Sequence, residues 1–154
     1  MRIGSKPDGP LEWLLVKANK IPLPLIDSFS AMMNARAILT ANEMGIFNAL
    51  VERPLPPRVL ARHLGASARG IEILADALCA NGYLAREGDR LGLTEFSRKW
   101  LVRSSPTYIG NMLEHVNDLW AVWLYLEEAI RTGVPTAGHY QKWLRNEALL
   151  PRKV

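Results

Sequence analysis

The sequence from Pro57 to Trp100 reads PRVLARHLGASARGIEILADALCANGYLAREGDRLGLTEFSRKW, and it predicts two short helices in succession. Pro57 suits the first turn of a helix, and Gly65 ends that helix after a short apolar face. Ser67 can cap a second helix, whose apolar residues recur at three- and four-residue spacing (Ile71, Leu74, Ala75 and Leu78). The pair of helices with its tight turn is typical of a helix-turn-helix.

A two-stranded ribbon follows the second helix. Residues 83–85 and 91–93 predict short strands, joined by the polar turn at residues 86–89. Thr94 can then cap a short helix that ends at Trp100. The fold class is therefore mainly α, a winged helix-turn-helix with a small two-stranded wing and long flanking helices.

An arm and a long helix precede this unit. Leu11 to Asn19 predicts a short amphipathic helix, and residues 21–24 (Ile-Pro-Leu-Pro) predict a helix-incompatible linker. We expect Asp27 or Ser28 to cap a long helix that runs to Met44, with Gly45 as its stop. One or two further helical turns are predicted at residues 46–51.

A second long helix is predicted after Pro106, and it runs to about Arg131 before Gly133 ends it. Residues 119–126 are apolar almost all round the helix, so more than one side must be covered. In a chain this small, the second cover is expected from another subunit. A further short helix is predicted at residues 140–150.

Composition indicates one globular domain with an arm. The chain has 154 residues, of which 49% are hydrophobic and 22% charged, with a net charge of +4. We divide it into an N-terminal arm and linker (residues 1–27), a winged-helix domain (28–135) and a C-terminal tail (136–154). The single cysteine, Cys79, is expected to be a buried and inert thiol. The sequence shows no signal-peptide pattern and no apolar run of transmembrane length, which predicts a cytoplasmic protein.

The charges of the helix-turn-helix argue against nucleic acid as a partner. The second helix carries Arg69 against Glu72 and Asp76, and the wing turn has as many acidic as basic residues. Groove and phosphate contacts need a cationic surface, because neutralising phosphates supplies most of the affinity.

No pattern in the chain predicts catalysis, a metal site or a nucleotide-binding loop. No two glycines are close enough to cradle a phosphate, and the three histidines (His63, His115 and His139) lie far apart without a metal-ligand spacing. Glu127 and Glu128 are adjacent, so on a helix they point to different sides and cannot act as a pair. We therefore expect no catalytic, cofactor-binding or metal-binding residue in this chain.

The order of several motifs resembles the N-terminal dimerisation domain of S-adenosylmethionine-dependent small-molecule O-methyltransferases. The similarity covers residues 28–135 and is carried by six stretches: Ala37–Leu50 (AILTANEMGIFNAL), Leu60–Gly65 (LARHLG), Ile73–Leu78 (ILADAL), Gly82–Leu84 (GYL), Leu91–Ser97 (LGLTEFS) and Trp123–Pro135 (WLYLEEAIRTGVP). The resemblance implies an intertwined homodimer whose helices cover the substrate cleft of a following cofactor domain. It also implies S-adenosylmethionine as the cofactor of the parent protein and a small aromatic or polyketide-like substrate. The tail at residues 136–154 is then the possible start of that missing domain.

The same resemblance suggests which residues face the cleft and the partner subunit. His115 has two interpretations, a hydrogen-bonded histidine at a packed interface or a polar group lining an apolar ligand pocket. On the second interpretation, the substrate-lining residues are Asn111, Met112, His115 and Trp120. The dimer interface is expected at Met32, Leu39, Leu119, Trp123 and Leu126.

Three functions are open at this point. The first is the dimerisation and substrate-cleft domain of an O-methyltransferase, inactive alone. The second is a ligand-sensing winged-helix regulator that binds DNA. The third is a stand-alone homologue that binds a ligand or regulates a complete methyltransferase.

Overall fold

Two of the predicted helix starts are fixed by side-chain caps, within the residues 9–135 that the computed structural model describes. Ser67 Oγ accepts a 3.4 Å hydrogen bond from the Gly70 N–H at the start of α5 (Ala68–Ala80). Thr94 Oγ1 accepts one of 3.3 Å from the Ser97 N–H at the start of α6 (Glu95–Trp100). Both predictions are confirmed, because a cap of this kind depends only on local hydrogen bonding.

The predicted order of helix, turn, helix and ribbon is present. Helix α4 (Pro57–His63) precedes α5, and strands β1 (Leu84–Glu87) and β2 (Arg90–Leu93) pair antiparallel with Leu84 opposite Leu93. Each strand is longer than predicted, so only Gly88 and Asp89 remain as the turn. Upstream, Leu55 adds an isolated antiparallel bridge to Leu91. The mainly helical fold class with a small two-stranded sheet is confirmed.

The core lies inside this unit and at the end of the long helix that leads into it. Its most deeply buried side chains come from every element between residues 46 and 101 except the strand β1 (Ile46, Phe47, Leu50, Leu60, Ile71, Leu78, Leu91, Ser97 and Leu101). Ser97 is the polar member, and its hydroxyl donates a 2.6 Å hydrogen bond to the Tyr83 carbonyl. The buried Ser97 hydroxyl therefore has a hydrogen-bond partner within the core.

Helix α2 (Leu23–Glu43) begins earlier than the sequence suggests. We expected residues 21–24 to exclude helix and Asp27 or Ser28 to cap it, and both expectations are wrong. Pro22 occupies the cap position and Pro24 lies in the first turn, where a missing N–H costs nothing because that donor has no partner within the helix. The predicted boundary between arm and domain, at residues 27 and 28, thus lies inside one helix.

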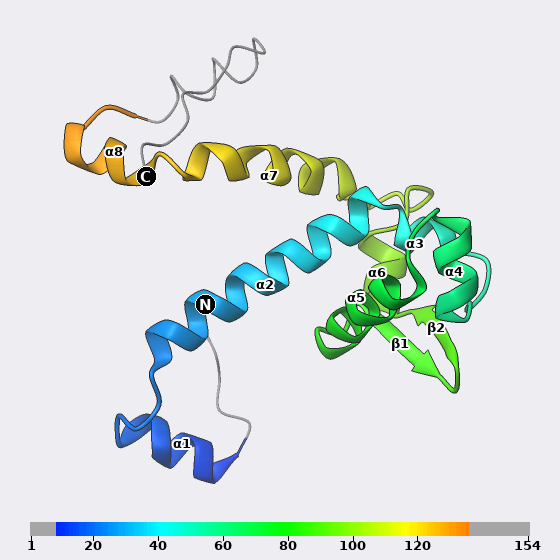
Figure 1. Cartoon of the computed structure of the whole chain (residues 1–154), viewed down its shortest axis with the longest axis horizontal. Coiled ribbons are helices and arrows are strands. Elements are labelled where there is room, and N and C mark those ends of the chain that lie inside the picture. Colours follow the sequence, from blue (N-terminus) through cyan, green and yellow to red (C-terminus); the bar gives the residue numbers. More distant parts are fainter. Residues whose placement is uncertain (1–8, 136–154) are drawn as a thin grey trace.

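The other end of α2 is as predicted. Gly45, with φ +75°, separates α2 from α3 (Ile46–Ala49), and a left-handed residue at this point favours glycine. The predicted helical turns at residues 46–51 are found as this short α3. Helix α1 (Pro10–Lys17) has no buried residue and lies beyond the far end of α2 from the core (Figure 1).

The second long helix is divided into two. Helix α7 (Gly110–Trp123) and α8 (Leu126–Thr132) replace the predicted continuous helix, and Gly133 ends α8 as expected. At the break, the Tyr125 N–H donates to the Val122 carbonyl at 3.1 Å, a three-residue spacing that tightens the turn. Apolar periodicity runs through this turn, so the sequence pattern does not reveal the break. The predicted helix at residues 140–150 lies outside the described residues.

Within the part of the chain that the structure describes, no helix is both long enough and apolar enough to cross a bilayer.

Candidate functional site

Helices α2 and α7 leave the core from a shared point and then diverge (Figure 1). The shared point is a hydrogen bond of 3.1 Å from the Asn42 side-chain amide to the Gly110 carbonyl. Asn42 is only 7% exposed, so this polar pair is enclosed by the core. Neither residue was predicted to have a role, because a single Asn in an apolar run gives no periodic signal.

Arg36 makes a second connection between the same helices, about two turns further from the core. Its Nη1 donates a 2.7 Å hydrogen bond to Asn117 Oδ1, and its Cζ lies 5.4 Å from the centre of the Trp120 ring. A guanidinium at this distance from an indole face is attracted by the ring quadrupole. Arg36 therefore ties α7 to α2 before the two helices separate.

Beyond Arg36 both helices expose large apolar side chains. Those on α2 are Leu25, Ile26, Phe29, Met32 and Met33, and those around the end of α7 and on α8 are Trp123, Leu124, Leu126 and Ile130. Soluble monomers rarely leave an apolar surface of this extent in water, and such patches mark sites of association. We call this the fork surface, defined by the nine residues just named.

Most of the predicted interface residues lie on or beside the fork surface. Met32, Trp123 and Leu126 are 45%, 65% and 45% exposed. Leu119, Trp123 and Leu126, together with Val122, line one small cavity of about 140 Å³ where α7 meets α8. Leu39 is different, because it is 3% exposed and already packed within its own chain. Almost no Leu39 surface is left for a partner to cover, so we drop Leu39 from the interface.

The four predicted substrate-lining residues do not share one face of α7. At 100° per residue, Asn111, Met112 and His115 lie within one third of the helix circumference, whereas Trp120 lies 80° beyond Met112 and 180° from Asn111. Asn111, Met112 and His115 are exposed, with Met112 at 62%, whereas Trp120 is half-buried against Arg36. The structure therefore brings three of the four together and assigns Trp120 to the contact with α2.

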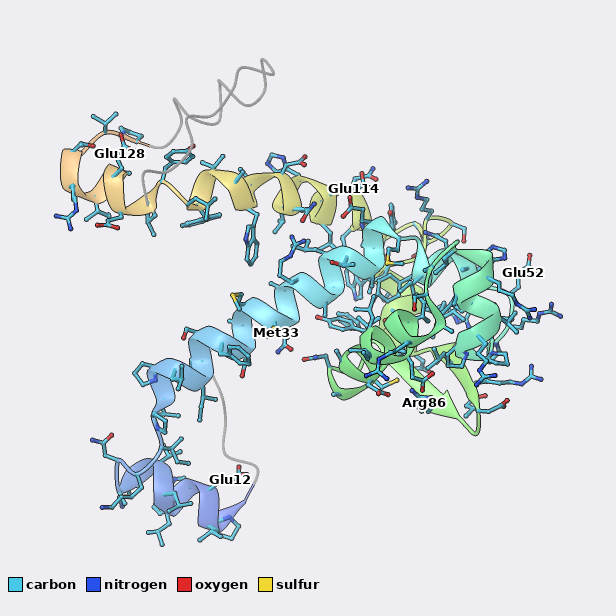
Figure 2. The ribbon with its side chains drawn as sticks, viewed as in Figure 1. Glu12, Met33, Glu52, Arg86, Glu114 and Glu128 are labelled. Carbon is cyan, nitrogen blue, oxygen red and sulfur yellow. The ribbon has the colours of Figure 1, made fainter. Side chains whose placement is uncertain are left out.

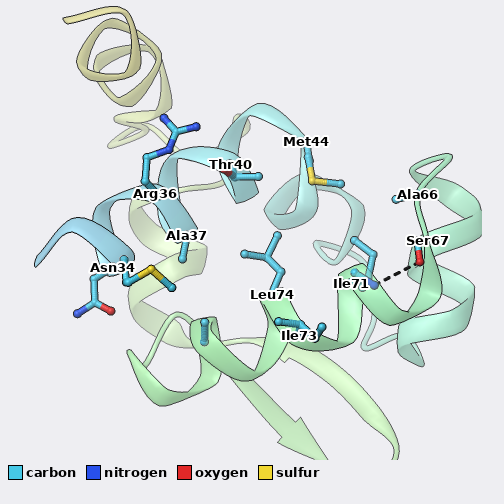
Figure 3. Close-up of a pocket in the computed structure, with 13 residues that line it drawn as sticks. Asn34, Arg36, Ala37, Thr40, Met44, Ala66, Ser67, Ile71, Ile73 and Leu74 are labelled. Carbon is cyan, nitrogen blue, oxygen red and sulfur yellow. Dashed lines mark hydrogen bonds between the residues drawn. The ribbon is translucent and has the colours of Figure 1, made fainter. Parts of the chain in front are cut away.

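A groove of about 480 Å³ between α2 and α5 was missed by the sequence analysis (Figure 3). Its floor is apolar and includes Ala37, Met44, Ile71, Ile73 and Leu74, and its rim carries the polar residues Asn34, Arg36, Thr40 and Ser67. Ile73 on α5 is 59% exposed. It lies outside the apolar stripe that the sequence predicted for this helix, and yet the residue itself is apolar. An apolar residue outside the predicted apolar stripe was therefore the sequence feature that could have indicated the groove.

The face that a DNA-binding winged helix would present is occupied by ion pairs. Arg86 on β1, labelled in Figure 2, lies 2.7 Å from Glu72 Oε1 and 2.7 Å from Asp76 Oδ1, both on α5. The charge of Arg86 is thereby neutralised by two carboxylates. This supports the argument, made from sequence charge, against a phosphate-binding surface.

Cys79 has the environment of an unreactive thiol. It is half-buried beside the core, and burial raises its pKa, an effect opposed by the nearby charge of Arg86. A thiol with a raised pKa holds little thiolate at neutral pH, and the thiolate is the nucleophile. The geometry thus gives Cys79 no catalytic role.

The described residues do not fit a nucleotide-type cofactor such as S-adenosylmethionine. The sheet is a two-stranded antiparallel ribbon, whereas such cofactors bind at the carboxyl ends of parallel strands with a glycine-rich turn. The glycines with positive φ end helices or form the hairpin turn (Gly45, Gly65, Gly82, Gly88 and Gly133). Among residues 9–135, no group of three or more His, Cys, Asp or Glu side chains could hold a metal ion. We assign no methyl-transfer step to these residues.

Comparison with known proteins gives consistent matches. A family model described as the O-methyltransferase dimerisation domain matches residues 26–103. The chain is 34% identical to the tetracenomycin polyketide synthesis 8-O-methyl transferase TcmO of Streptomyces glaucescens, over 77% of this chain and 37% of that protein. It is 37% identical to acetylserotonin O-methyltransferase of Gallus gallus, over 64% of this chain and 31% of that protein.

The fold of this chain is also similar to part of a solved methyltransferase structure. Human N-acetylserotonin methyltransferase in complex with SAM superposes with a TM-score of 0.62 and 28% identity, covering 86% of this chain and 40% of that one. The chain spans about a third of the length of the curated relatives that it matches.

Proposed function

Because this chain belongs to the O-methyltransferase dimerisation-domain family, we propose that it forms the homodimer contact and covers the substrate cleft of an S-adenosylmethionine-dependent O-methyltransferase. The chain by itself supplies no catalytic group in this proposal. S-adenosylmethionine is the cofactor of the whole enzyme, and this domain's residues do not hold it.

The observation that carries the proposal is the fork surface. Its residues include Trp123 and Ile130, at 65% and 76% exposed, and large apolar surfaces of this kind mark sites of association. Burial of apolar surface contributes about 25 cal/mol per Å², and a second copy offers the same surface in return. In a symmetric dimer, two identical fork surfaces would therefore bury each other's apolar side chains.

For the substrate, we propose a small aromatic or polyketide-like methyl acceptor, since TcmO is a polyketide O-methyltransferase by its name. The exposed face of α7 that carries Asn111, Met112 and His115 is the part of this chain that would line the cleft. Its combination of a flexible thioether, an amide and an imidazole suits an acceptor that is apolar with a few polar groups.

The DNA-binding regulator is not proposed, because the family match and the Arg86 ion pairs both point away from it.

Sedimentation equilibrium tests the homodimer directly. The chain should sediment at twice its mass of 17.3 kDa at micromolar concentration. A stable monomer at that concentration would overturn the proposed function.

A further inference from the structure

We propose that helix α4 is the docking site for an acidic partner protein, one that presents a helix with carboxylates one turn apart. The inference goes beyond the proposed function and does not depend on the homodimer. It starts from the arginines in and around α4, which belong neither to the fork surface nor to the face of α7 that would line the cleft.

The positive charge of the chain is concentrated in this segment. Residues 53–69 contain four arginines (Arg53, Arg58, Arg62 and Arg69) and neither aspartate nor glutamate. The four arginines equal the net charge of +4, so basic and acidic residues balance over the rest of the chain. A local excess of one sign creates a field that attracts molecules of the opposite charge.

The side chains of these four arginines lack the partners that other arginines have. Arg86 is paired with two carboxylates of α5, and Arg131 is paired with Glu127 at 3.0 Å. Within residues 9–135, by contrast, the four arginine side chains are exposed and have neither an ion pair nor a hydrogen bond. Their guanidinium groups are therefore available to carboxylates from another molecule.

Arg58 and Arg62 form the centre of this surface. They are four residues apart, so their side chains lie about 40° apart around α4 and share its exposed face. The opposite face of α4, which carries Leu60 and Ala61, is buried in the core. Like charges at this spacing repel each other, and carboxylates of a partner would relieve that repulsion. The core thus holds α4 in place while two guanidinium groups, one turn apart, face the solvent.

The surface stays accessible in the proposed dimer. Helix α4 lies at the opposite end of the molecule from α1 and α8 (Figure 1). None of the nine residues of the fork surface belongs to α4. A partner on α4 and a second copy on the fork surface can therefore bind the chain at the same time.

The surroundings of α4 favour an acidic protein over nucleic acid. Carboxylates follow on α5 (Glu72 and Asp76) and on the wing (Glu87 and Asp89). A duplex is a long and uniform polyanion, so its phosphates would meet these carboxylates as well. An acidic helix offers a short row of carboxylates, and the planar fork of arginine can bind a carboxylate through two parallel hydrogen bonds. The short basic surface is therefore matched by a helix better than by a duplex.

Fluorescence anisotropy with designed peptides tests the proposal. The probe is a labelled alanine-rich helical peptide with glutamates at four-residue spacing. Its control peptide has the same number of glutamates at two-residue spacing, which places them on different sides of the helix. We expect the full chain of 154 residues to bind the probe at least tenfold more tightly than the control peptide.

Two pairs of substitutions locate the contact. Arg58→Gln with Arg62→Gln should weaken binding of the probe at least tenfold. Lys17→Gln with Lys20→Gln removes the same charge from the N-terminal arm and should change binding less than twofold. Equal effects of the two pairs, or equal binding of the two peptides, would overturn the proposal, because net charge alone would then attract the probe.

Two further results contradict the assignment. A DNA duplex that binds more tightly than the probe, and through the same two arginines, would identify α4 as a nucleic-acid surface. No binding of the probe at millimolar concentration would remove the docking site altogether.

Charge reversal gives a second measurement. Arg58→Glu with Arg62→Glu should abolish binding of the glutamate probe and create binding of a peptide that has lysines at the same positions. Circular dichroism checks that the variant keeps the helix content of the parent chain. A folded variant that binds the lysine peptide no better than the parent chain does would show that the peptide does not lie on α4.

Discussion

The side-chain amide of Asn42 donates a 3.1 Å hydrogen bond to the main-chain carbonyl of Gly110, and this bond joins the end of α2 to the start of α7. Gly110 is also buried, and a Cβ at this position would overlap the Tyr108 hydroxyl. The first residue of α7 is thus held by an amide on one side and crowded by a tyrosine on the other. The start of α7 is thereby held against the end of α2.

Replacing Asn42 tests that role. Asn42→Ala removes a buried hydrogen bond, and we expect the free energy of unfolding to fall by about 1–3 kcal/mol. Urea unfolding followed by circular dichroism measures the change. Asn111→Ala, at an exposed position on α7, is the control and should stay within about 0.5 kcal/mol of the parent chain. Equal stability of both variants would show that the Asn42 amide does not secure α7.

The contact between Arg36 and Trp120 predicts an energetic coupling between α2 and α7. A double-mutant cycle with Arg36→Met and Trp120→Leu should give a coupling of about 0.5–1 kcal/mol, the usual range for an exposed cation–π pair. Urea unfolding of the four proteins supplies the values. The pair Lys99→Met and Trp120→Leu serves as a control with no shared contact, and its two effects should add. If the effects of Arg36→Met and Trp120→Leu also add, the contact between these two residues does not stabilise the packing of α7 on α2.

The parts of this fold that the sequence predicted are those governed by neighbouring residues. Ser67 and Thr94 cap their helices through bonds three residues away, and Gly45 and Gly133 end helices by their own left-handed backbone. Such features need no knowledge of the rest of the chain. Some of the missed features need contacts between distant residues, such as Asn42 with Gly110, 68 positions apart.

The predictions about the site divide in the same way. Trp123 and Leu126 were assigned to an interface because their helix is apolar all round, and both are exposed as that reasoning requires. Leu39 belongs to a similar apolar pattern, yet its own core covers it. Periodicity identifies the residues that avoid water, but only the packing of α2 on its neighbours decides which of them are covered within the chain. The break between α7 and α8 was missed because apolar side chains continue through it.

The environment of Cys79 predicts its reactivity as a function of pH. Burial raises its pKa above the ordinary value of 9.0, so the folded chain forms thiolate at higher pH than the unfolded chain does. We expect the midpoint of iodoacetamide alkylation against pH to be higher in native protein than in urea. By the same linkage, any contribution of Cys79 to stability is constant at neutral pH and declines as the pH rises through 9.0, because the unfolded chain then loses its proton first. A native midpoint at or below that of the unfolded chain would contradict the assignment of an inert thiol.

A charge placed at Trp123 tests whether the fork surface forms the dimer contact. Trp123 is 65% exposed in the single chain, so Trp123→Asp should fold normally, and its circular dichroism should match that of the parent. In a dimer, the new carboxylate would have to leave water and enter an apolar contact, which costs several kcal/mol when it has no partner. Since each 1.4 kcal/mol is a factor of ten in affinity, sedimentation equilibrium should show the dimer Kd raised at least tenfold. Ser104→Asp adds the same charge in an exposed loop and should leave the Kd unchanged. If Trp123→Asp sediments like the Ser104 variant, the ends of α7 and α8 lie outside the contact, and the dimer must form through other surfaces of the chain.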